Sequence, residues 1–447
     1  MAKLGGTAIV AGRSMGGLAA AAALSKYFER VLVLDKDPPP SGVAPRLGVG
    51  QGHHLHNLLR GGELSIEKLL PGACVDLMAS GGVPLRAGID MKISDHGQRL
   101  PERDLGYDNI SASRPLIEHI VLQRLLREPS IELRPTTSVE DLIFDGGGRV
   151  CGVLSRTNGS AVDRIGADLV VDCTGRLSKA NDILSAHARQ DVPEFKINIG
   201  ISYTSAIFEA PREAVDGKKG IAVLPSPPNK HGAFVSLIED GKWLVSLHTR
   251  FEKKLPTTQE EMLLFADEME TPDTADFLKQ AKLQTPIRSY RKLDATWRRF
   301  DKLASFPNGF LLLGDSLTSF NPIFGQGMST AWLQAVALEE LLSLRVADKR
   351  GLEGLAKDYL PSAMQISREA WNGSTLIDWA YSEVTGDKRP GTEQGILYLR
   401  ALRTLLAEDP ELHADYIGVG QLTTPGTALM RPDRMKRVLG AMTRLAP

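Results

Sequence analysis

The chain has 447 residues, and its 53 Lys and Arg side chains nearly balance 54 Asp and Glu side chains, which gives a formal net charge of -1. A chain of this length exceeds one typical hydrophobic core, so we expect two or three lobes. The balanced charge provides no general electrostatic attraction to nucleic acid or to an anionic membrane.

Three isolated cysteines, Cys74, Cys151 and Cys173, form no CxxC pair, which is typical of a reduced protein. The N-terminal residues lack the pattern of a signal peptide, and no apolar run reaches the ~18 residues that a membrane-spanning helix needs. We therefore expect a soluble, cytoplasmic protein with no membrane span and no nucleic-acid partner.

A strand, a Gly-rich turn, a helix and a second strand are predicted at the N-terminus. Residues 7–11 form an apolar strand, an Ala-rich helix extends to about Tyr27, and a second strand over residues 31–34 ends at Asp35. The turn reads Gly12-Arg13-Ser14-Met15-Gly16-Gly17, which is the GxGxxG pattern with Ser14 in place of the middle Gly.

Each part of this unit suits a dinucleotide. Gly12 permits the tight turn, and Gly17 permits close packing of the helix. The helix N-terminus favours a pyrophosphate, and Asp35, 18 positions after Gly17, can hold a ribose hydroxyl. The unit predicts dinucleotide binding, and the alternative is a Rossmann-like turn with a structural role only.

Residues 46–56 contain too many Gly residues for a helix or a central strand and are predicted to form a loop. The loop holds His53, His54 and His56. A metal site is not expected, because no cysteine and no evident carboxylate lies near and a loop fixes no ligand geometry. The loop either contributes to a binding site or is simply solvated.

Residues 58–70 predict an amphipathic helix that ends before Pro71-Gly72. Ser113 is predicted as the N-cap of a further helix, with Pro115 at its first position. Arg114 then stands at the N-terminal end of that helix, where a forked guanidinium suits phosphate oxygens, and the alternative is a solvent-exposed arginine.

Strands are predicted from residue 131 to residue 171, with Gly146-Gly147-Gly148 as a hairpin turn between two of them. The last of these strands closes on a turn at Thr174-Gly175. From residue 197 to residue 250 four alternating stretches predict a second sheet, and Asp240-Gly241 predicts a hairpin between the last two.

Two helical segments are predicted around residues 260–269 and 274–281. The Arg-rich stretch 288–300, which holds Trp297, is expected to pack between lobes, and the alternative is an anion-binding patch. After residue 344 the chain is predicted to be largely helical. Trp371, Trp379 and Tyr381 in that part either fill a core or wall an apolar substrate pocket.

Residues 310–330 read FLLLGDSLTSFNPIFGQGMST and contain the most informative motif. Residues 310–313 predict a buried strand, Asp315 follows at its end, and Gly325-Gln326-Gly327 lead into a helix. The Gly residues permit close approach of a ligand, and the free N–H groups of the helix favour negative charge. Asp315 can accept hydrogen bonds from the hydroxyls of a sugar-like chain, and the alternative is an ordinary turn between strand and helix.

The run GD…NP-x-F-GQGM is similar to the second flavin-contacting motif of FAD-dependent monooxygenases of the aromatic-hydroxylase type. It is closest to their bacterial tailoring branch, which includes the polyether epoxidases. The N-terminal fingerprint, the QG-x-H-x-H run from Gln51 and the segment DLVVD-x-TG ending at Gly175 resemble the same family, and the likeness covers most of residues 5–335. The last segment departs from the stricter DG motif of the aromatic hydroxylases, so their particular NADPH handling is not implied.

The resemblance implies FAD as cofactor and NAD(P)H as a transient co-substrate, because no second GxGxxG provides a nicotinamide domain. No catalytic acid or base is readable, and His53, His54 and His56 are the candidates near the flavin. The residues expected at the cofactor are Gly12, Ser14, Met15, Gly17, Asp35, Lys36, Arg46, Gln51, Arg114, Val139, Thr174, Gly175, Asp315, Pro322, Gly325, Gln326, Gly327 and Met328.

The implied fold is α/β, with an FAD-binding Rossmann-like domain of the glutathione-reductase type, an interleaved α+β substrate-binding domain and a helical C-terminal region. We expect residues 1–190 to form the FAD-binding domain with part of the substrate lobe inserted, and residues 191–300 to form the substrate-binding sheet. Residues 301–345 would return to the FAD-binding domain, and residues 346–447 would form the helical region.

The implied activity is a monooxygenase reaction with NAD(P)H and O2, in which a flavin C4a-hydroperoxide epoxidises or hydroxylates a natural-product intermediate of secondary metabolism. The substrate would be a small apolar, polyene or aromatic molecule, and the protein either a monomer or a homodimer. An alkene reductase of the geranylgeranyl-reductase type and a non-catalytic flavin-binding protein stay open. Halogenation is disfavoured, because the WxWxIP segment of flavin-dependent halogenases is absent.

Overall fold

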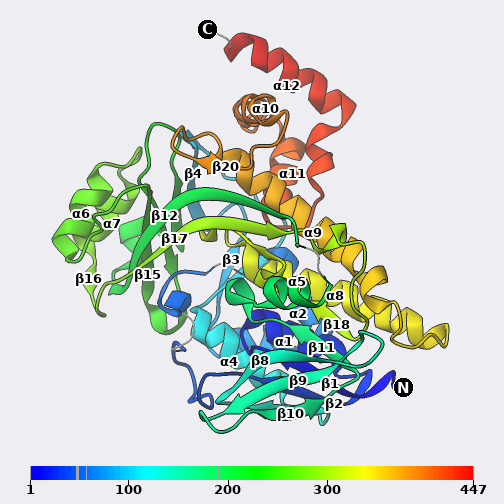
Figure 1. The fold of residues 1–447 in the computed structure, drawn as a ribbon. Helices are drawn as coiled ribbons and strands as arrows, with labels where there is room; N and C mark the ends of the chain where they lie inside the picture. The colour runs from blue at the N-terminus through cyan, green and yellow to red at the C-terminus, as the bar shows by residue number, and fades with distance from the viewer. Residues whose placement is uncertain (1, 47–49, 57, 189–190, 446–447) are drawn as a thin grey trace.

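The computed structural model describes residues 2–46, 50–56, 58–188 and 191–445. Two sheets organise the chain, a parallel sheet near the N-terminus and a larger, mostly antiparallel sheet beside it (Figure 1). The α/β fold class, the Rossmann-like parallel sheet and the helical C-terminal region predicted from the sequence are confirmed. None of the described helices is long and apolar enough to cross a membrane.

The parallel sheet has five strands in the order β18-β11-β1-β2-β7. Toward their carboxyl ends its central strands are mostly apolar and buried, because both faces of the sheet are covered there. Every neighbouring pair is parallel, so the carboxyl ends of all five strands lie at one edge. The strands are β1 (Gly5–Ala11), β2 (Phe28–Leu34), β7 (Ile131–Arg134), β11 (Leu169–Asp172) and β18 (Phe310–Leu312).

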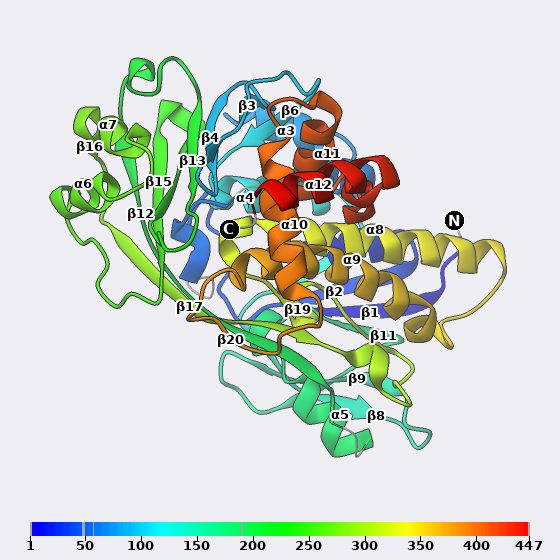
Figure 2. The same cartoon turned by 90° about the horizontal axis from the view of Figure 1, so that it is seen from above.

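Helices cover one face of this sheet and a small antiparallel sheet covers the other. Figure 2 shows β1 and β11 between α8 on one side and β8 and β9 on the other. The predicted hairpin at Gly146-Gly147-Gly148 is confirmed, since β8 pairs with β9 across it. The elements are α1 (Met15–Leu24), α2 (Arg60–Leu69), α3 (Ala73–Ala79), α4 (Arg114–Leu125), β8 (Thr137–Phe144), β9 (Val150–Thr157), β10 (Asp163–Gly166) and α5 (Ala180–Ala188).

Helix α1 is Ala-rich, and its small side chains let the helix lie close to β1, β2 and α8. It ends at Leu24, earlier than predicted, because the Tyr27 N–H already bonds the Leu24 carbonyl in a turn that leads into β2. The predicted N-cap of α4 is confirmed, because Ser113 Oγ accepts from the Leu116 N–H.

The larger sheet has ten strands and is built around β12 and its neighbours β17 and β15. The predicted hairpin at Asp240-Gly241 is confirmed between β14 and β15. The strands are β4 (Met91–Asp95), β5 (Gln98–Arg99), β12 (Glu194–Glu209), β13 (Gly220–Leu224), β14 (Gly232–Leu237), β15 (Trp243–Arg250), β16 (Lys282–Leu283), β17 (Arg288–Arg298), β19 (Thr318–Ser319) and β20 (Thr385–Gly386), and β3 (Val83–Arg86) pairs with β6 (Asp108–Ser111) in a separate ribbon.

The two faces of this sheet differ in character. On β15, Trp243, Val245 and Leu247 belong to the apolar cluster beneath α6 (Gln259–Asp267) and α7 (Asp273–Gln280). The alternate residues Ser246, His248 and Arg250 therefore point to the opposite face, because side chains alternate along a strand. That polar inner face is turned toward the rest of the molecule.

The stretch 288–300 differs from the prediction only in forming a long strand, β17. Trp297 is buried, and the Arg299 guanidinium lies 4.6 Å from the centre of its ring. Arg298 donates to the carbonyl oxygens of Asp315 and Ser316. These arginines hold neighbouring elements together, as expected for packing between lobes.

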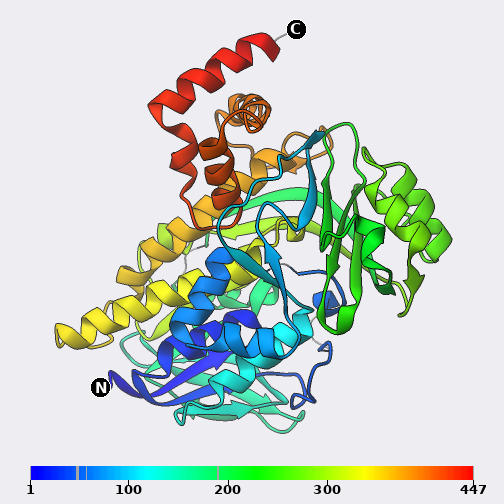
Figure 3. The ribbon, with the colours of Figure 1, turned by 180° about the vertical axis from the view of Figure 1, so that it is seen from behind.

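The C-terminal part is helical. Helix α8 (Gln326–Ala347) runs beside α9 (Leu355–Asp378), and Trp371 of α9 is fully buried in the main core, which favours the core role over a pocket wall. Helices α10 (Thr392–Thr404), α11 (Pro410–Gly420) and α12 (Pro432–Leu445) form a separate cluster with its own apolar core, at the end of the molecule away from the parallel sheet (Figure 3).

Candidate functional site

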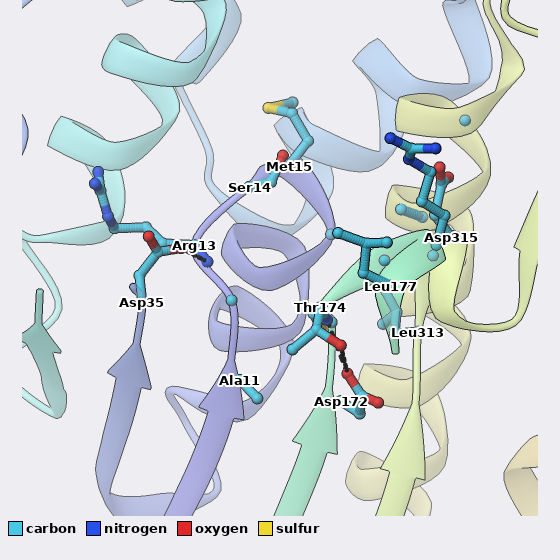
Figure 4. A pocket seen from close by; sticks show the side chains of 18 of the residues that line it. Ala11, Arg13, Ser14, Met15, Asp35, Asp172, Thr174, Leu177, Leu313 and Asp315 are labelled. Atoms are coloured by element: carbon cyan, nitrogen blue, oxygen red, sulfur yellow. Dashed lines mark hydrogen bonds between the residues drawn. The ribbon is translucent and has the colours of Figure 1, made fainter. Parts of the chain in front are cut away.

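A cavity of about 590 Å³ lies at the carboxyl ends of the parallel strands. Figure 4 shows Ala11, Asp35, Asp172 and Leu313 at the ends of four neighbouring strands, with Asp315 across the cavity from Asp35. Ligands in open α/β sheets bind at this edge, because the connecting loops and helix N-termini gather there. The cavity is therefore the candidate binding site.

Asp35 anchors one end of the cavity. Its carboxylate accepts from the Arg13 and Asp37 N–H groups at 2.6 and 2.8 Å, and it pairs with the Arg46 guanidinium at 2.9 Å. Arg46 also contacts Asp37 at 2.8 Å. The structure thus places Arg46 at the Asp35 end, where it partly neutralises a buried acidic cluster.

Two helices point their N-termini into the cavity. Helix α1 starts after Ser14 and α8 starts after Gly325, and among the described residues neither N-terminus donates a backbone N–H to a capping side chain. The first four N–H groups of a helix have no partner within the helix, so these groups are free to bind a ligand. Gly325 adopts φ 66, a left-handed conformation that Gly reaches without strain.

The glycines of the first turn are required by close packing. Gly12 has φ 99, and a Cβ atom there would lie 2.7 Å from the Cys173 carbonyl oxygen. A Cβ atom on Gly17 would lie 1.8 Å from the Gly12 carbonyl oxygen. Gly17 does not line the cavity, so its role is the close helix packing predicted from the fingerprint.

The strand end at Thr174 is held by Asp172. The Thr174 N–H and Oγ1 both donate to Asp172 Oδ1, at 2.8 and 2.6 Å (Figure 4). The Gly175 N–H donates to Ser316 Oγ at 2.9 Å, which ties this turn to the one that carries Asp315. The two motifs predicted at the cofactor therefore form one wall of the cavity.

Arg114 is buried and connects three elements. Its guanidinium contacts Glu118 at 2.8 Å, Ser14 Oγ at 2.9 Å and His56 Nε2 at 3.1 Å. His56 Nδ1 lies 2.8 Å from the His54 carbonyl oxygen, so Nδ1 carries the proton and Nε2 accepts from Arg114. Burial and the Arg114 charge lower the pKa of His56 to about 3, so the ring is neutral at pH 7.

The three histidines of the loop lie in different surroundings. His56 lines the cavity, His53 is exposed, and His54 is buried against the inner face of the large sheet, 2.8 Å from Ser205 Oγ. Burial lowers the pKa of His54 to about 4. Among the described residues no three His, Cys, Asp or Glu side chains form a group that could hold a metal.

Nearly all residues predicted at the cofactor meet in this cavity. All of them line it except Gly17, and of the three candidate histidines only His56 does. The sequence reasoning did not single out Arg176, Lys179, Tyr290 and Lys292, which also line it. Tyr290 and Lys292 lie on β17, and their alternation along that strand was the signal that could have identified them.

The lining of the cavity fits the chemistry of a dinucleotide flavin. It joins an acid suited to a ribose, a Gly-rich helix N-terminus suited to a pyrophosphate and a second acid beside a second helix N-terminus. The buried Gln326 Oε1 has no hydrogen-bond partner among the described residues, so this wall retains a free acceptor. Asp35, Ser14, Asp315 and the start of α8 are the groups that would hold FAD.

Replacing Asp315 with Ala is expected to weaken FAD binding about tenfold to hundredfold, because a charged hydrogen bond contributes about 1.5–3 kcal/mol. Asp315 lies beside the start of α8. Its Oδ1 is 3.3 Å from the position that a Cβ atom on Gly327 would occupy. Titration of the apoprotein with FAD, followed by fluorescence quenching, measures the change. Asp348→Ala at the exposed far end of α8 is the matched control, and equal affinity of the Asp315→Ala protein and the parent would remove this role from Asp315.

The chain resembles a curated protein of Mycobacterium tuberculosis in sequence. A scan against protein-family models finds no match. Protein Rv3254 of Mycobacterium tuberculosis is 31% identical over 399 residues, which are 86% of this chain and 82% of that protein.

Two solved structures share the fold. The flavin-dependent brominase Bmp2 has a TM-score of 0.69 at 14% identity and covers 100% of both chains. PqsL of Pseudomonas aeruginosa, described as a probable FAD-dependent monooxygenase, has a TM-score of 0.64 at 17% identity, over 84% of this chain and 97% of that chain. At such identities these likenesses establish the fold alone.

Proposed function

The chain belongs to the family of Protein Rv3254 and has the fold of the aromatic-hydroxylase-like flavoproteins, and on this basis we propose that it is an FAD-dependent monooxygenase. NAD(P)H would serve as a transient co-substrate and O2 as the oxidant. The substrate would be a small natural-product intermediate that is epoxidised or hydroxylated.

One observation carries the proposal. A single cavity connects Asp35, at the end of β2, with the start of α8 and with Tyr290 and Lys292 on the large sheet. An adenosine end, a pyrophosphate and a flavin ring therefore have a continuous path that ends beside a second lobe. A nucleotide site of ordinary length would need no such continuation.

Different residues along this path would contact different parts of FAD. Asp35 would accept from the ribose hydroxyls, and the N–H groups at the start of α1 would bind the pyrophosphate. Asp315 would accept from the ribityl hydroxyls, and the start of α8 would lie beside the ring. When bound, FAD supplies the redox chemistry with NAD(P)H and O2, while the protein positions the substrate and excludes water.

The inner face of the large sheet is the proposed substrate side. It carries Tyr203 next to His54, with ring centres 4.5 Å apart, and Gln51 Nε2 donates to the Tyr203 hydroxyl at 3.1 Å. Burial lowers the pKa of His54 to about 4, and burial raises the pKa of Tyr203 above its usual range, so both groups are uncharged near pH 7. Neutral aromatic groups suit an apolar polyene or aromatic substrate.

An alkene reductase is the second candidate, because the same cofactor site and the same neutral aromatic groups would serve hydride delivery to a double bond. A non-catalytic flavin-binding protein would use the same site without turnover. The absence of a WxWxIP segment argues against halogenation, although Bmp2 is described as a brominase.

The test is to purify the yellow protein, identify its flavin by chromatography and follow NADPH or NADH oxidation with O2 and with a panel of polyene and aromatic compounds. A monooxygenase is expected to consume NAD(P)H and O2 together, to release hydrogen peroxide without substrate, and to place one ¹⁸O atom from labelled O2 in the product. Alkene saturation without O2 would support the reductase instead. Bound flavin that NAD(P)H never reduces, with any compound, would support the non-catalytic protein.

A further inference from the structure

One lysine side chain enters the cavity from the large sheet. Lys292 on β17 lines the cavity, and only 7% of the residue is exposed. Its ammonium donates to Ser319 Oγ and to the Phe320 carbonyl oxygen, both at 2.6 Å. An ammonium has three hydrogens, so one N–H remains without an acceptor among the described residues.

The two acceptors place this charge at a defined point of the cavity wall. Phe320 directly precedes Asn321-Pro322, the segment that leads to α8. Ser319 Oγ lies 3.3 Å from Asp315 Oδ2, so a hydrogen-bonded path connects Lys292 to the carboxylate proposed to hold the ribityl chain. The ammonium therefore lies at the ring end of the proposed cofactor path.

The groups around Lys292 act in opposite directions on its protonation. Asp315 on the strand-end turn and Asp294 on β17 favour the charged form, whereas Arg176 after β11 and Arg298 on β17 oppose it. Burial is the largest influence, and together these lower the pKa of Lys292 to about 8. At pH 7 the side chain is therefore mostly a buried cation.

We propose that Lys292 is the cationic group that stabilises the reduced, anionic form of the flavin ring in the cavity. This inference rests on the proposed function and deepens it by naming a residue for one of the two redox states. A buried positive charge is costly unless an anion compensates for it, and reduction of the flavin supplies that anion. The N-terminus of α8 adds a second positive end at the same wall.

The test compares the flavin-loaded parent with Lys292→Gln and Lys292→Arg. Gln keeps an N–H donor for the Phe320 carbonyl oxygen and removes the charge, whereas Arg keeps the charge. In Lys292→Gln the affinity for reduced FAD relative to oxidised FAD is expected to fall about tenfold at pH 7. This change lowers the midpoint potential by about 30 mV for a two-electron couple. Lys292→Arg is expected to stay near the parent.

The pH dependence separates charge from packing. The Lys292 pKa lies near 8. The midpoint potential of the parent should therefore exceed that of Lys292→Gln by the full amount well below pH 8, and this difference should disappear as the pH rises above 8. Lys292→Arg should still have a higher midpoint potential than Lys292→Gln at pH 9, because a guanidinium stays charged. If Lys292 only supported the turn at Ser319, the difference in midpoint potential between the parent and Lys292→Gln would not change with pH in this way.

Lys302→Met, just after β17, is the matched control, since its ammonium is exposed and does not line the cavity. If Lys292→Gln does not fold, Lys292→Arg alone still tests the proposal through its retained potential at pH 9. Equal midpoint potentials in the parent and in Lys292→Gln would overturn the role of Lys292 and leave the flavin site standing. A parent protein that binds no flavin would overturn both proposals.

Discussion

The Gly12→Val protein is expected to purify without flavin. Gly12 has φ 99, a conformation that L side chains rarely adopt, and even a Cβ atom would lie 2.7 Å from the Cys173 carbonyl oxygen. The turn between β1 and α1 must therefore move, and the N–H groups at the start of α1 move with it. We also expect the free energy of unfolding to fall by about 3 kcal/mol, because strain and a backbone clash act together.

The flavin-to-protein ratio by absorbance and a urea titration measure the two effects. Gly6→Ala lies at the other end of the same strand, where a Cβ atom meets only Asp168 Oδ2 at 3.6 Å and Glu29 Oε2 at 3.9 Å. This control should keep its flavin. Flavin occupancy in Gly12→Val equal to that of the parent would argue against the first turn as the pyrophosphate site.

The Arg250→Met protein is expected to lose about 3–5 kcal/mol of unfolding free energy. Arg250 and Asp378 form a pair at 2.8 Å in which both side chains are almost wholly buried. Removing the cation leaves the Asp378 carboxylate in the core with Asn321 Nδ2, at 2.7 Å, as its one donor among the described residues. Since Asn321 begins the segment that leads to α8, flavin retention should fall as well.

Adding Asp378→Asn to Arg250→Met should recover part of the loss, because it removes the uncompensated charge. Lys388→Met is the matched control, since its pair with Glu393 is exposed and should contribute less than about 1 kcal/mol. Urea denaturation of the four proteins gives the comparison. A loss below 1 kcal/mol in Arg250→Met would mean that water reaches the pair.

Local patterns in the sequence predicted most of the proposed cofactor site. The runs from Gly12 to Gly17 and from Asp315 to Met328 combine strand, turn and helix signals within short stretches, and nearly all of their predicted contacts line one cavity. Arg46 was expected at the cofactor, and it lines the cavity at the Asp35 end, because Asp35 and Asp37 attract its guanidinium. That pairing follows from the path of the chain after β2, which no local pattern specifies.

The sequence alone determined the class of fold and the two Gly-rich turns, because hydrophobic period, Gly positions and strand-end carboxylates depend on near neighbours. Only the tertiary structure decided which side chains of the large sheet meet the cavity and the segments around it. Lys292 meets Ser319, and Arg250 meets Asp378, through strands and helices that are distant in sequence. A residue on a strand presents the same local pattern whether its face meets solvent, an apolar core or a cofactor cavity, so the partner across the interface has to be seen.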